Sequence, residues 1–436
     1  MRVTLKITLD NPQIVKQQLL LWSQHSHEVV WLDSNNYQQK YNEFDAILAV
    51  DAFTVLQTDY TNAFQQLDEY QQTTKDWIFG YLSYDLKNDV ENLVSQNHDG
   101  LAFPELYFFQ PKKLFFLKGN ELEVQYLNMV DDELEVDIEE ILQTEIHTEI
   151  FEKGVSNKEH RPKIKLRIHK DEYHEKVTKV LAHIHRGDIY EANFCQEFYA
   201  ENATIDPVST YAHLNAISKP PFATYMRLSD KYILSASPER YIKKNGTKIT
   251  SQPIKGTAKR VSNPVEDKKL ATDLQNDEKE RAENVMIVDL VRNDLAKTAK
   301  KGSVKVEELC KIYTFDQVHQ MISTVTSEVS ETQNPVEILR TTFPMGSMTG
   351  APKISAMQII ENLEETKRGI YSGAIGYFAP NNDFDFNVVI RSILYNSTKQ
   401  YVSYSVGGAI TAKSIPEKEY EECLIKAKAM REALEL

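Results

Sequence analysis

Apolar residues recur at helical spacing in the second half of the chain. Within 171–186 they lie three and four positions apart, on one face of a helix. They are Tyr173, Val177, Val180, Leu181 and Ile184. Gly187 is suited to end this helix, because glycine readily takes the left-handed conformation that follows a last turn. The same reasoning predicts helices over 62–72, 277–297, 335–342, 354–363 and 416–434.

Two of these helices carry start signals. Asn276 or Asp277 can cap the helix of 277–297, since both side chains accept hydrogen bonds from free N–H groups. Ser414 with Glu417 three residues later is a capping-box pattern, and Pro416 suits a first turn. We therefore expect both helices to begin at these positions.

Shorter apolar stretches bounded by turn residues predict β-strands. They lie at 45–50, 77–84, 232–236, 248–254, 373–378, 387–394 and 401–406. The regular strand–helix alternation of a Rossmann domain is missing. Helices mixed with antiparallel-looking strands predict an α+β fold.

The charge pattern divides the chain into three parts. Residues 131–152 are strongly acidic and 153–165 are basic. We interpret 131–165 as a connecting segment between an N-terminal region, 1–130, and a larger C-terminal region, 166–436. A solvated strand pair within one domain would explain the same pattern equally well.

Composition narrows the class of protein. The 436 residues include 50 Lys plus Arg and 64 Asp plus Glu, a formal charge of −14, with 41% hydrophobic residues. These values indicate a folded protein and disfavour non-specific binding to nucleic acid or to anionic membranes. An anionic substrate would need local cations or a metal ion.

No segment predicts secretion or membrane insertion. No run approaches 18 apolar residues, and the N-terminus lacks the apolar core of a signal peptide. Cys195, Cys310 and Cys423 are widely spaced without a CxxC motif, as in proteins of a reducing compartment. We expect a cytoplasmic protein that binds neither nucleic acid nor membrane.

Two predicted helices each present a carboxylate pair at i, i+3. The pairs are Glu280 with Glu283 and Glu419 with Glu422, and Lys426 follows on the second face. Facing one another, they would form an oxygen-rich site for Mg²⁺, which commonly takes one or two carboxylates and keeps positions for water and substrate. The alternative is ordinary surface charge. The residues that follow Glu283 are too apolar for a fully solvated helix, which argues against the surface-charge alternative.

Two further residues could carry chemistry. Lys255 lies between a predicted strand and Gly256, and a desolvated lysine with a lowered pKa can act as a nucleophile. Glu239 directly follows a predicted strand, a suitable place for a general acid. Taken alone, the alternatives are a solvated turn lysine and a turn salt bridge.

Glycine-rich segments could bind anions through backbone N–H groups. The segment 346–353 precedes a predicted helix, although it lacks the spacing and the Gly-Lys-Ser/Thr of a P-loop. Gly407-Gly408-Ala409 follows a predicted strand and could offer donors to a carboxylate. The histidines form no zinc-site pattern.

Taken together and in this order, these motifs resemble the chorismate-utilising enzymes, the group that contains anthranilate synthase component I, isochorismate synthase and aminodeoxychorismate synthase component I. The stretches that carry the resemblance are 187–193, 237–239, 253–257, 280–284, 289–295, 346–353 and 416–426, with looser matches at 31–34 and 79–86. The resemblance implies two stacked, mainly antiparallel β-sheets flanked by helices, to which both halves of the chain contribute. It also makes 166–436 the chorismate-binding catalytic region.

The resemblance assigns roles to individual residues. It implies Glu283 and Glu422 as Mg²⁺ ligands, with Glu280 and Glu419 behind them through water. It implies that Glu239 protonates the departing hydroxyl and that Lys255 adds covalently to the ring. The remaining matched positions would bind the two substrate carboxylates: Gly256 and Thr257 the ring carboxylate, and Tyr377, Arg391, Gly408, Ala409 and Lys426 that of the enolpyruvyl group.

The residue type at the position of Lys255, in the Pro-Ile-Lys-Gly-Thr motif, differs between the branches of the family. Anthranilate synthases typically carry Ala there, so the resemblance is closest to the aminodeoxychorismate synthases, which serve 4-aminobenzoate and folate synthesis. It implies ammonia from a separate glutamine amidotransferase subunit, and tryptophan binding by the N-terminal half near Pro220-Pro221-Phe222 is an open expectation. The alternatives are anthranilate synthase component I, then isochorismate or salicylate synthase, then a catalytically silent chorismate-binding subunit.

Three positions depart from the family pattern. Glu191 stands where isochorismate synthases carry a water-activating Lys and this branch often has Gln. Gln320 replaces a frequent His. Ala409 replaces a common Gly, and a positive φ there would be costly. The missing Lys at 191 argues against water as the nucleophile.

Overall fold

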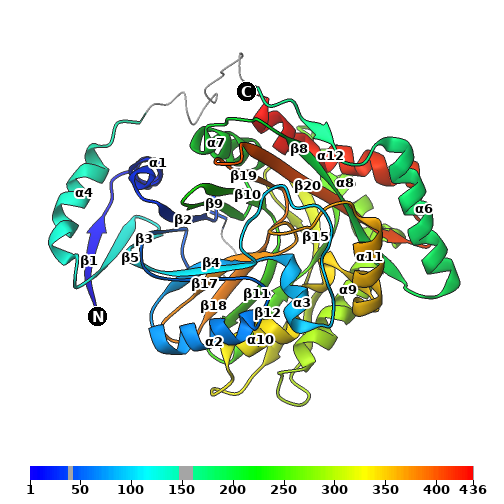
Figure 1. Cartoon of the computed structure of the whole chain (residues 1–436), viewed down its shortest axis with the longest axis horizontal. Helices are drawn as coiled ribbons and strands as arrows, with labels where there is room; N and C mark the ends of the chain where they lie inside the picture. The colour runs from blue at the N-terminus through cyan, green and yellow to red at the C-terminus, as the bar shows by residue number, and fades with distance from the viewer. Residues whose placement is uncertain (38–42, 147–160, 436) are drawn as a thin grey trace.

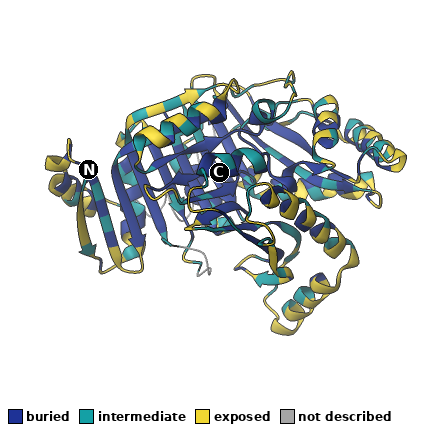
Figure 2. Cartoon of the chain, turned by 90° about the horizontal axis from the view of Figure 1, so that it is seen from below, coloured by how far each residue is buried: buried dark blue, intermediate teal, exposed yellow. Residues whose placement is uncertain are grey.

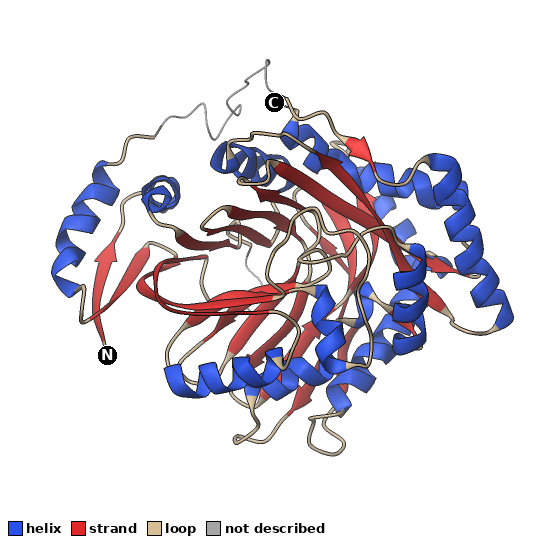
Figure 3. Ribbon diagram, in the orientation of Figure 1, coloured by secondary structure: helices blue, strands red, loops and turns tan. Residues whose placement is uncertain are grey.

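Most helices lie on the outside of the molecule and most strands in its interior (Figure 3). A computed structural model of the chain describes residues 1–37, 43–146 and 161–435. In Figure 2 the residues of the strands are mostly buried, and the helices are exposed on their outer faces. No helix within the described ranges is long and apolar enough to cross a membrane.

The helices are α1 (Pro12–Trp22), α2 (Ala63–Thr74), α3 (Lys87–Val90), α4 (Leu134–Gln143), α6 (Lys170–Arg186), α7 (Pro207–Ser218), α8 (Pro264–Asn276), α9 (Glu278–Ala296), α10 (Pro335–Thr342), α11 (Lys353–Leu363) and α12 (Pro416–Leu434), with short 3₁₀ turns such as η4 (Gly346–Met348).

The strands are β1 (Arg2–Thr8), β2 (Glu28–Asp33), β3 (Ala46–Thr58), β4 (Ile78–Leu82), β5 (Leu106–Lys118), β6 (Glu121–Leu127), β7 (Lys165–Leu166), β8 (Glu191–Ala200), β9 (Phe222–Leu228), β10 (Lys231–Ser237), β11 (Arg240–Asn245), β12 (Lys248–Gln252), β13 (Ile254–Lys259), β14 (Lys305–Thr314), β15 (Val318–Glu328), β16 (Gly350–Ala351), β17 (Ala374–Phe378), β18 (Phe384–Val388), β19 (Ser392–Asn396) and β20 (Tyr401–Thr411).

The described strands form one continuous hydrogen-bonded set of twenty. Three apolar clusters show how this set is layered. One packs strands against α1, α6, α7, α11 and α12. A second packs other strands against α2, α9 and α10, which lie along the lower side of Figure 1. The third joins the two strand layers, with Val30, Phe79 and Met226 among its members. The predicted α+β fold of two stacked layers is confirmed, although both layers belong to one continuous set.

Strands of the first 130 residues pair directly with strands of the C-terminal part. β2 pairs antiparallel with β9, and β4 pairs antiparallel with β17. Within the segment 131–165, α4 packs against α1, and the greater part of the predicted basic stretch, up to residue 160, lies outside the described residues. The division of the chain at this segment stays a prediction.

Most predicted helices are confirmed, and α10 and α12 have the predicted bounds. Gly187 ends α6 with φ +89°, and the Asp277 side chain caps α9. The capping box at Ser414 is wrong. Ile415 occupies the N-cap of α12 without a side-chain bond, because the Ser414 hydroxyl accepts from Thr411 N instead.

Three strand predictions need correction. The single strand of 387–394 is wrong, because Arg391 has φ +53° and breaks the chain into β18 and β19. The strand of 248–254 is likewise two strands, interrupted at Pro253. Gly407-Gly408-Ala409 lies within β20 and does not follow it.

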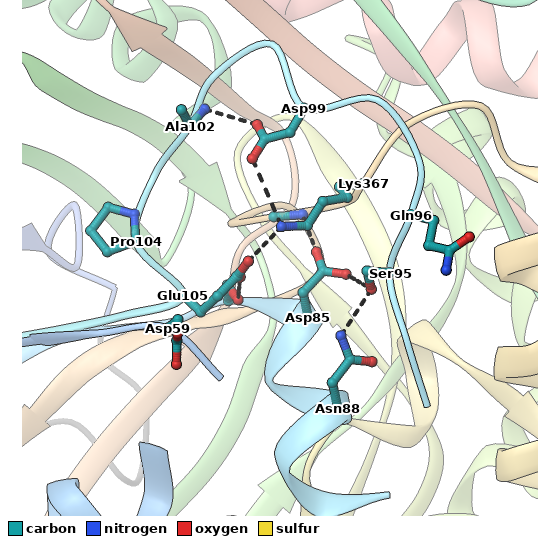
Figure 4. Close-up of polar contacts among 12 residues, drawn as sticks. Asp59, Asp85, Asn88, Ser95, Gln96, Asp99, Ala102, Pro104, Glu105 and Lys367 are labelled. Atoms are coloured by element: carbon teal, nitrogen blue, oxygen red, sulfur yellow. Dashed lines mark hydrogen bonds and ion pairs between the residues drawn. The ribbon is translucent and has the colours of Figure 1, made fainter. Parts of the chain in front are cut away.

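A partly buried polar cluster joins the loop after β4 to the segment that precedes β17 (Figure 4). Lys367 forms an ion pair with Glu105, 2.6 Å apart, and reaches Asp99 at 3.8 Å. Asp85, 1% exposed, accepts hydrogen bonds from Ser95 and, at 2.8 Å, from Gly369 N. The cluster joins parts of the chain that are more than 260 residues apart.

The same segment supports strand β8. The Arg368 guanidinium donates to Asn193 O and to Met348 O, both at 2.6 Å, and is paired with Glu364 at 2.7 Å. Arg368 is 6% exposed, so these bonds are made away from water, where hydrogen bonds of a charged group are strong. The position of β8 therefore depends on contacts with the segment that precedes β17.

We predict that Asp85→Asn destabilises the protein by about 3 kcal/mol, because it leaves the buried Lys87 ammonium with one carboxylate fewer. Lys87 is 1% exposed and lies 3.3 Å from both Asp85 and Glu361. Urea unfolding measures the loss. Asp99→Asn, a change at the exposed side of the same cluster, should cost under about 1 kcal/mol. Equal losses in the two variants would contradict a special role of the buried pair.

Candidate active site

Lys255 enters the interior from a β-bulge. The register of β13 against β15 shifts between Ile254 and Thr257, and Gly256 has φ +90°. Bulges re-aim side chains next to functional sites, and glycine takes this backbone conformation without strain. The Lys255 side chain is 11% exposed, and its Nζ lies 3.3 Å from Glu191 Oε1. The interpretation as a solvated turn lysine is therefore wrong.

The charges around Lys255 favour its ammonium form. Burial acts to lower the pKa of Lys255, but the carboxylates of Glu191, Glu283 and Glu239 outweigh burial, so its pKa is raised. This corrects the expectation of a lowered pKa. Desolvation alone would produce a free amine, whereas three nearby carboxylates stabilise the charged form.

Glu239 lies in the turn between β10 and β11, with 4% of its surface exposed. Burial raises the pKa of Glu239 to about 7, although hydrogen bonds from the Ser347 side chain and the Ile254 backbone and the charge of Lys255 act to lower it. A carboxylic acid that keeps its proton near neutral pH is suited to general-acid catalysis. The alternative of a solvent-facing turn salt bridge is wrong.

The two predicted carboxylate pairs come together from α9 and α12. Lys279 bridges the helices, because its Nζ lies 3.7 Å from both Glu283 Oε1 and Glu419 Oε1. Burial, with repulsion between neighbouring carboxylates, raises the pKa of Glu283 to about 7 and raises that of Glu419. In Glu422 burial acts in the same direction, but Lys426 at 2.5 Å outweighs it and the pKa is lowered.

Glu280 completes this group beside the bulge. A Cβ built on Gly256 would lie 3.1 Å from Glu280 Oε2, so the glycine allows close contact between α9 and β13. Burial is the main cause that raises the pKa of Glu280. The four carboxylates therefore lie around Lys279 and next to Lys255, and the interpretation as scattered surface charge is wrong.

Gly408 in β20 faces the second carboxylate pair. A Cβ on Gly408 would lie 3.5 Å from Glu419 Oε2, 3.6 Å from Glu422 Oε1 and 3.8 Å from Lys426 Nζ. Lys426 Nζ donates to Gly407 O at 2.9 Å. Ala409 has no positive φ, so replacing the usual glycine introduces no strain. Gly408, Ala409 and Lys426 thus lie together at the edge of the site.

Arg391 projects into the same region, but Tyr377 does not. No described residue accepts a hydrogen bond from the Arg391 guanidinium, and its electrostatic neighbours are Tyr371 and Glu422. Tyr377 packs against Trp77 and Phe79, with ring centroids 5.5 Å away from each. Tyr371, six residues earlier, is the tyrosine that lies near Arg391.

The sequence profile of the chorismate binding enzymes matches residues 27–432. The chain belongs to the chorismate-binding enzyme family. It is 34% identical to aminodeoxychorismate synthase component 1 of Bacillus subtilis over 365 residues, 82% of this chain and 76% of that protein. It is 40% identical to the Escherichia coli protein of the same name over 266 residues, 61% of this chain and 58% of that protein.

Other relatives carry other names. Anthranilate synthase component 1 of Thermus thermophilus is 33% identical over 363 residues, 82% of this chain and 77% of that protein. Anthranilate synthase component I from Streptococcus pneumoniae superposes with a TM-score of 0.77 at 25% identity, covering 91% of this chain and 94% of that chain. The menaquinone-specific isochorismate synthase from Escherichia coli shares the fold, with a TM-score of 0.76 at 16% identity, covering 100% of this chain and 94% of that chain.

The acidic group of this chorismate-binding enzyme fits a magnesium ion that is completed by water and substrate. Glu283 Oε1 is buried without a hydrogen-bond partner, and Glu422 lies on the facing helix. Among the described residues no three acidic, histidine or cysteine side chains are close enough to hold a metal by themselves. Mg²⁺ needs only one or two carboxylates from the protein, and Glu283 with Glu422 as its ligands stays a prediction.

The other predicted residues are Thr257 and the segment 346–353, and only part of that segment contacts the candidate active site. Thr257 pairs with Gln320 across β13 and β15, and Gln320 Oε1 is buried without a partner. The segment 346–353 contributes Ser347, which bonds Glu239, whereas Lys353 Nζ bonds Asp294 at 2.6 Å. Anion binding at the start of α11 stays a prediction.

A separate pocket lies at the predicted tryptophan region. Pro221 and Phe222 line it together with Asp33, Ser34 and Tyr377, so both halves of the chain contribute. Its acidic side chains could accept an α-ammonium group. Tryptophan binding there stays a prediction.

Sequence reasoning missed three residues of this site. Lys279 is four residues before Glu283, a spacing that predicts an ion pair on one helix face. Ser347 and Tyr371 gave no local signal in the sequence. Ser347 bonds Glu239, which lies far away in sequence. Tyr371 lies near Arg391, which follows beyond an irregular turn.

We predict that Glu239→Gln stabilises the metal-free protein at pH 8 and has little effect at pH 4. Between the ordinary pKa of 4.5 and about 7, the folded protein keeps a proton that the unfolded chain has lost. Wild-type stability therefore falls as the pH rises through this window, by about 3 kcal/mol at most, while the variant stays neutral. Urea unfolding at several pH values measures the difference.

Glu417→Gln is the control for this pH trend. Lys170 lowers the pKa of the exposed Glu417, so removing that carboxylate should give a small effect of opposite sign. A difference between wild type and Glu239→Gln that does not change with pH would contradict a neutral Glu239.

Proposed function

We propose that this protein is aminodeoxychorismate synthase component I, which converts chorismate and ammonia to 4-amino-4-deoxychorismate for 4-aminobenzoate and folate synthesis. The observation that carries the proposal is the Lys255 side chain, only 11% exposed, whose Nζ lies 3.3 Å from Glu191 among the acidic groups of the site. The resemblance of its motif to that branch of the family and the names of two relatives support the same conclusion.

The residues of the site fit a two-step replacement of the C4 hydroxyl. Glu239 gives its proton to the departing hydroxyl, which leaves as water, while Lys255 adds at C2 of the ring. Ammonia then adds at C4, the C2–N bond breaks, and Lys255 is released. The enolpyruvyl group stays on the product.

Cations and backbone groups hold the two substrate carboxylates. Arg391 and Lys426, with the backbone of Gly408 and Ala409, bind the enolpyruvyl carboxylate, and Arg391 is suited to a bidentate contact. Gly256 and Thr257 line the ring carboxylate. Glu283 and Glu422 would hold a magnesium ion, with Glu280 and Glu419 behind them, and the ion would supply Lewis-acid polarisation of the ring carboxylate.

Two partner assignments belong to this proposal. A separate glutamine amidotransferase subunit supplies the ammonia, as the "component 1" in the names of the relatives indicates. Tryptophan is the proposed occupant of the pocket lined by Asp33, Pro221 and Phe222.

Anthranilate synthase component I is the second candidate, because two relatives of that name are 34% and 33% identical over 82% of this chain. Such an enzyme would release pyruvate and would not need a nucleophilic lysine. Lys255 is therefore the residue that separates the two candidates.

We predict that the chain, given chorismate, Mg²⁺ and ammonium, yields 4-aminobenzoate only when aminodeoxychorismate lyase is added. Mass spectrometry identifies the products. Lys255→Ala should lower product formation by more than about a hundredfold, since no other side chain replaces the nucleophile. Lys259→Ala changes an exposed lysine of the same strand and should leave the rate unchanged. Anthranilate with pyruvate, or full activity of Lys255→Ala, would overturn the proposal.

We also predict that Glu283→Gln and Glu422→Gln each weaken Mg²⁺ binding at least about tenfold, because each removes one anionic ligand. Titration with Mn²⁺ followed by electron paramagnetic resonance measures the affinity without turnover. Glu421→Gln makes the same charge change on the exposed side of α12 and should bind normally. Equal affinities in all four proteins would place the metal elsewhere.

A further inference from the structure

Glu191 is the first residue of β8 and is fixed by strands on both sides. It pairs with Thr411 of β20 and with Ala351 of β16. Its side chain is 1% exposed. The backbone of Glu191 is thus held in two ladders, and its side chain lies in the interior.

The two oxygens of Glu191 have different surroundings. Oε1 accepts from Lys255 Nζ at 3.3 Å, and Oε2 is buried without a hydrogen-bond partner. A buried polar atom without a partner destabilises the folded protein. An oxygen kept in this state next to a proposed nucleophile points to a role in the reaction.

Lys255 needs a proton acceptor before it can react. Only the free amine is a nucleophile, and the surrounding carboxylates raise the pKa of Lys255. Within the described parts of the chain, Glu191 is the only residue that accepts a hydrogen bond from Lys255 Nζ. Glu239 is bonded to Ser347 and Ile254, and Glu283 faces Lys279.

We propose that Glu191 is a further catalytic residue, the general base that takes the proton from Lys255 and later returns it. This inference rests on the proposed function. The transfer converts the ammonium–carboxylate pair into an amine and a carboxylic acid. In a site that excludes water, the neutral pair avoids the desolvation penalty of two charges.

The proton balance closes over one turnover. Lys255 gives one proton to Glu191, then forms the C2–N bond as the C4–O bond breaks and Glu239 protonates the leaving water. The lysine nitrogen is then a secondary ammonium. Attack of ammonia at C4 breaks the C2–N bond and releases neutral Lys255 and the product ammonium. Glu191 returns its proton to Lys255, and solvent reprotonates Glu239.

The test compares Glu191→Gln with wild type in the lyase-coupled assay with ammonium. The amide fills the same space but accepts no proton, so kcat should fall about 10²- to 10⁴-fold, as expected for loss of a general base. The KM for chorismate should change little. At a fixed concentration of free ammonia, kcat of the variant should rise with pH, because hydroxide must then remove the Lys255 proton. Wild type should lack this rise over the same pH range.

Two further variants separate catalysis from folding. Glu191→Asp keeps a carboxylate base but shortens the side chain by one methylene, which moves the base away from Lys255. This variant should retain more activity than Glu191→Gln. Glu197→Gln removes another buried carboxylate of β8, which pairs with Arg167 at 3.0 Å, and should keep wild-type kcat. A kcat of Glu191→Gln within twofold of wild type, or equal losses for Glu191→Gln and Glu197→Gln, would overturn the inference.

A single-turnover experiment distinguishes failure of this inference from failure of the proposed function. Without ammonia, intact-protein mass spectrometry should detect wild-type Lys255 carrying chorismate less one water, and Glu191→Gln should form this adduct more slowly. Equal rates would overturn the role of Glu191 alone. Absence of the adduct from wild type, together with absence of aminodeoxychorismate, would overturn the proposed function and this inference with it.

Discussion

The antiparallel pairing of β8 with β20 is the interaction on which the site depends. It places Glu191 opposite Thr411 and Phe194 opposite Gly408, so the start of β8 and the glycines of β20 reach the site together. Since α12 follows β20 after a short turn, its inward carboxylates lie beside Gly408. A sheet satisfies its own backbone groups, so it can present several charged side chains rigidly in the interior.

Charge balance is the second constraint on this interior. The carboxylates of Glu239, Glu280, Glu283 and Glu419 all have raised pKa values, and burial is the first cause in each. Such a group of anions is stable only with cations among them, and Lys255 and Lys279 supply part of that charge. This balance of charges suits the proposed magnesium ion and the proposed dicarboxylate substrate.

Local patterns predicted most elements because helices and caps depend on neighbours in sequence. The bounds of α10 and α12 and the end of α6 at Gly187 follow from such signals. The break at Arg391 and the choice of Tyr371 over Tyr377 depend on backbone conformation and on contacts across the sheet, which periodicity does not encode. The family resemblance named residues that lie close together in the structure, such as Lys255 and Glu239. The direction of the Lys255 pKa shift could be found only from the carboxylates that surround it in the fold.

The pairing of β4 with β17 has a consequence for biosynthesis. About 290 residues separate the end of β4 from the start of β17, and a ribosome adding 5–20 residues per second needs roughly 15–60 s to make them. Throughout this interval the edge of β4 that β17 will cover has no strand to pair with. An uncovered apolar edge is a template for pairing with other chains. The emerging polypeptide is therefore exposed to such pairing until β17 has left the ribosome.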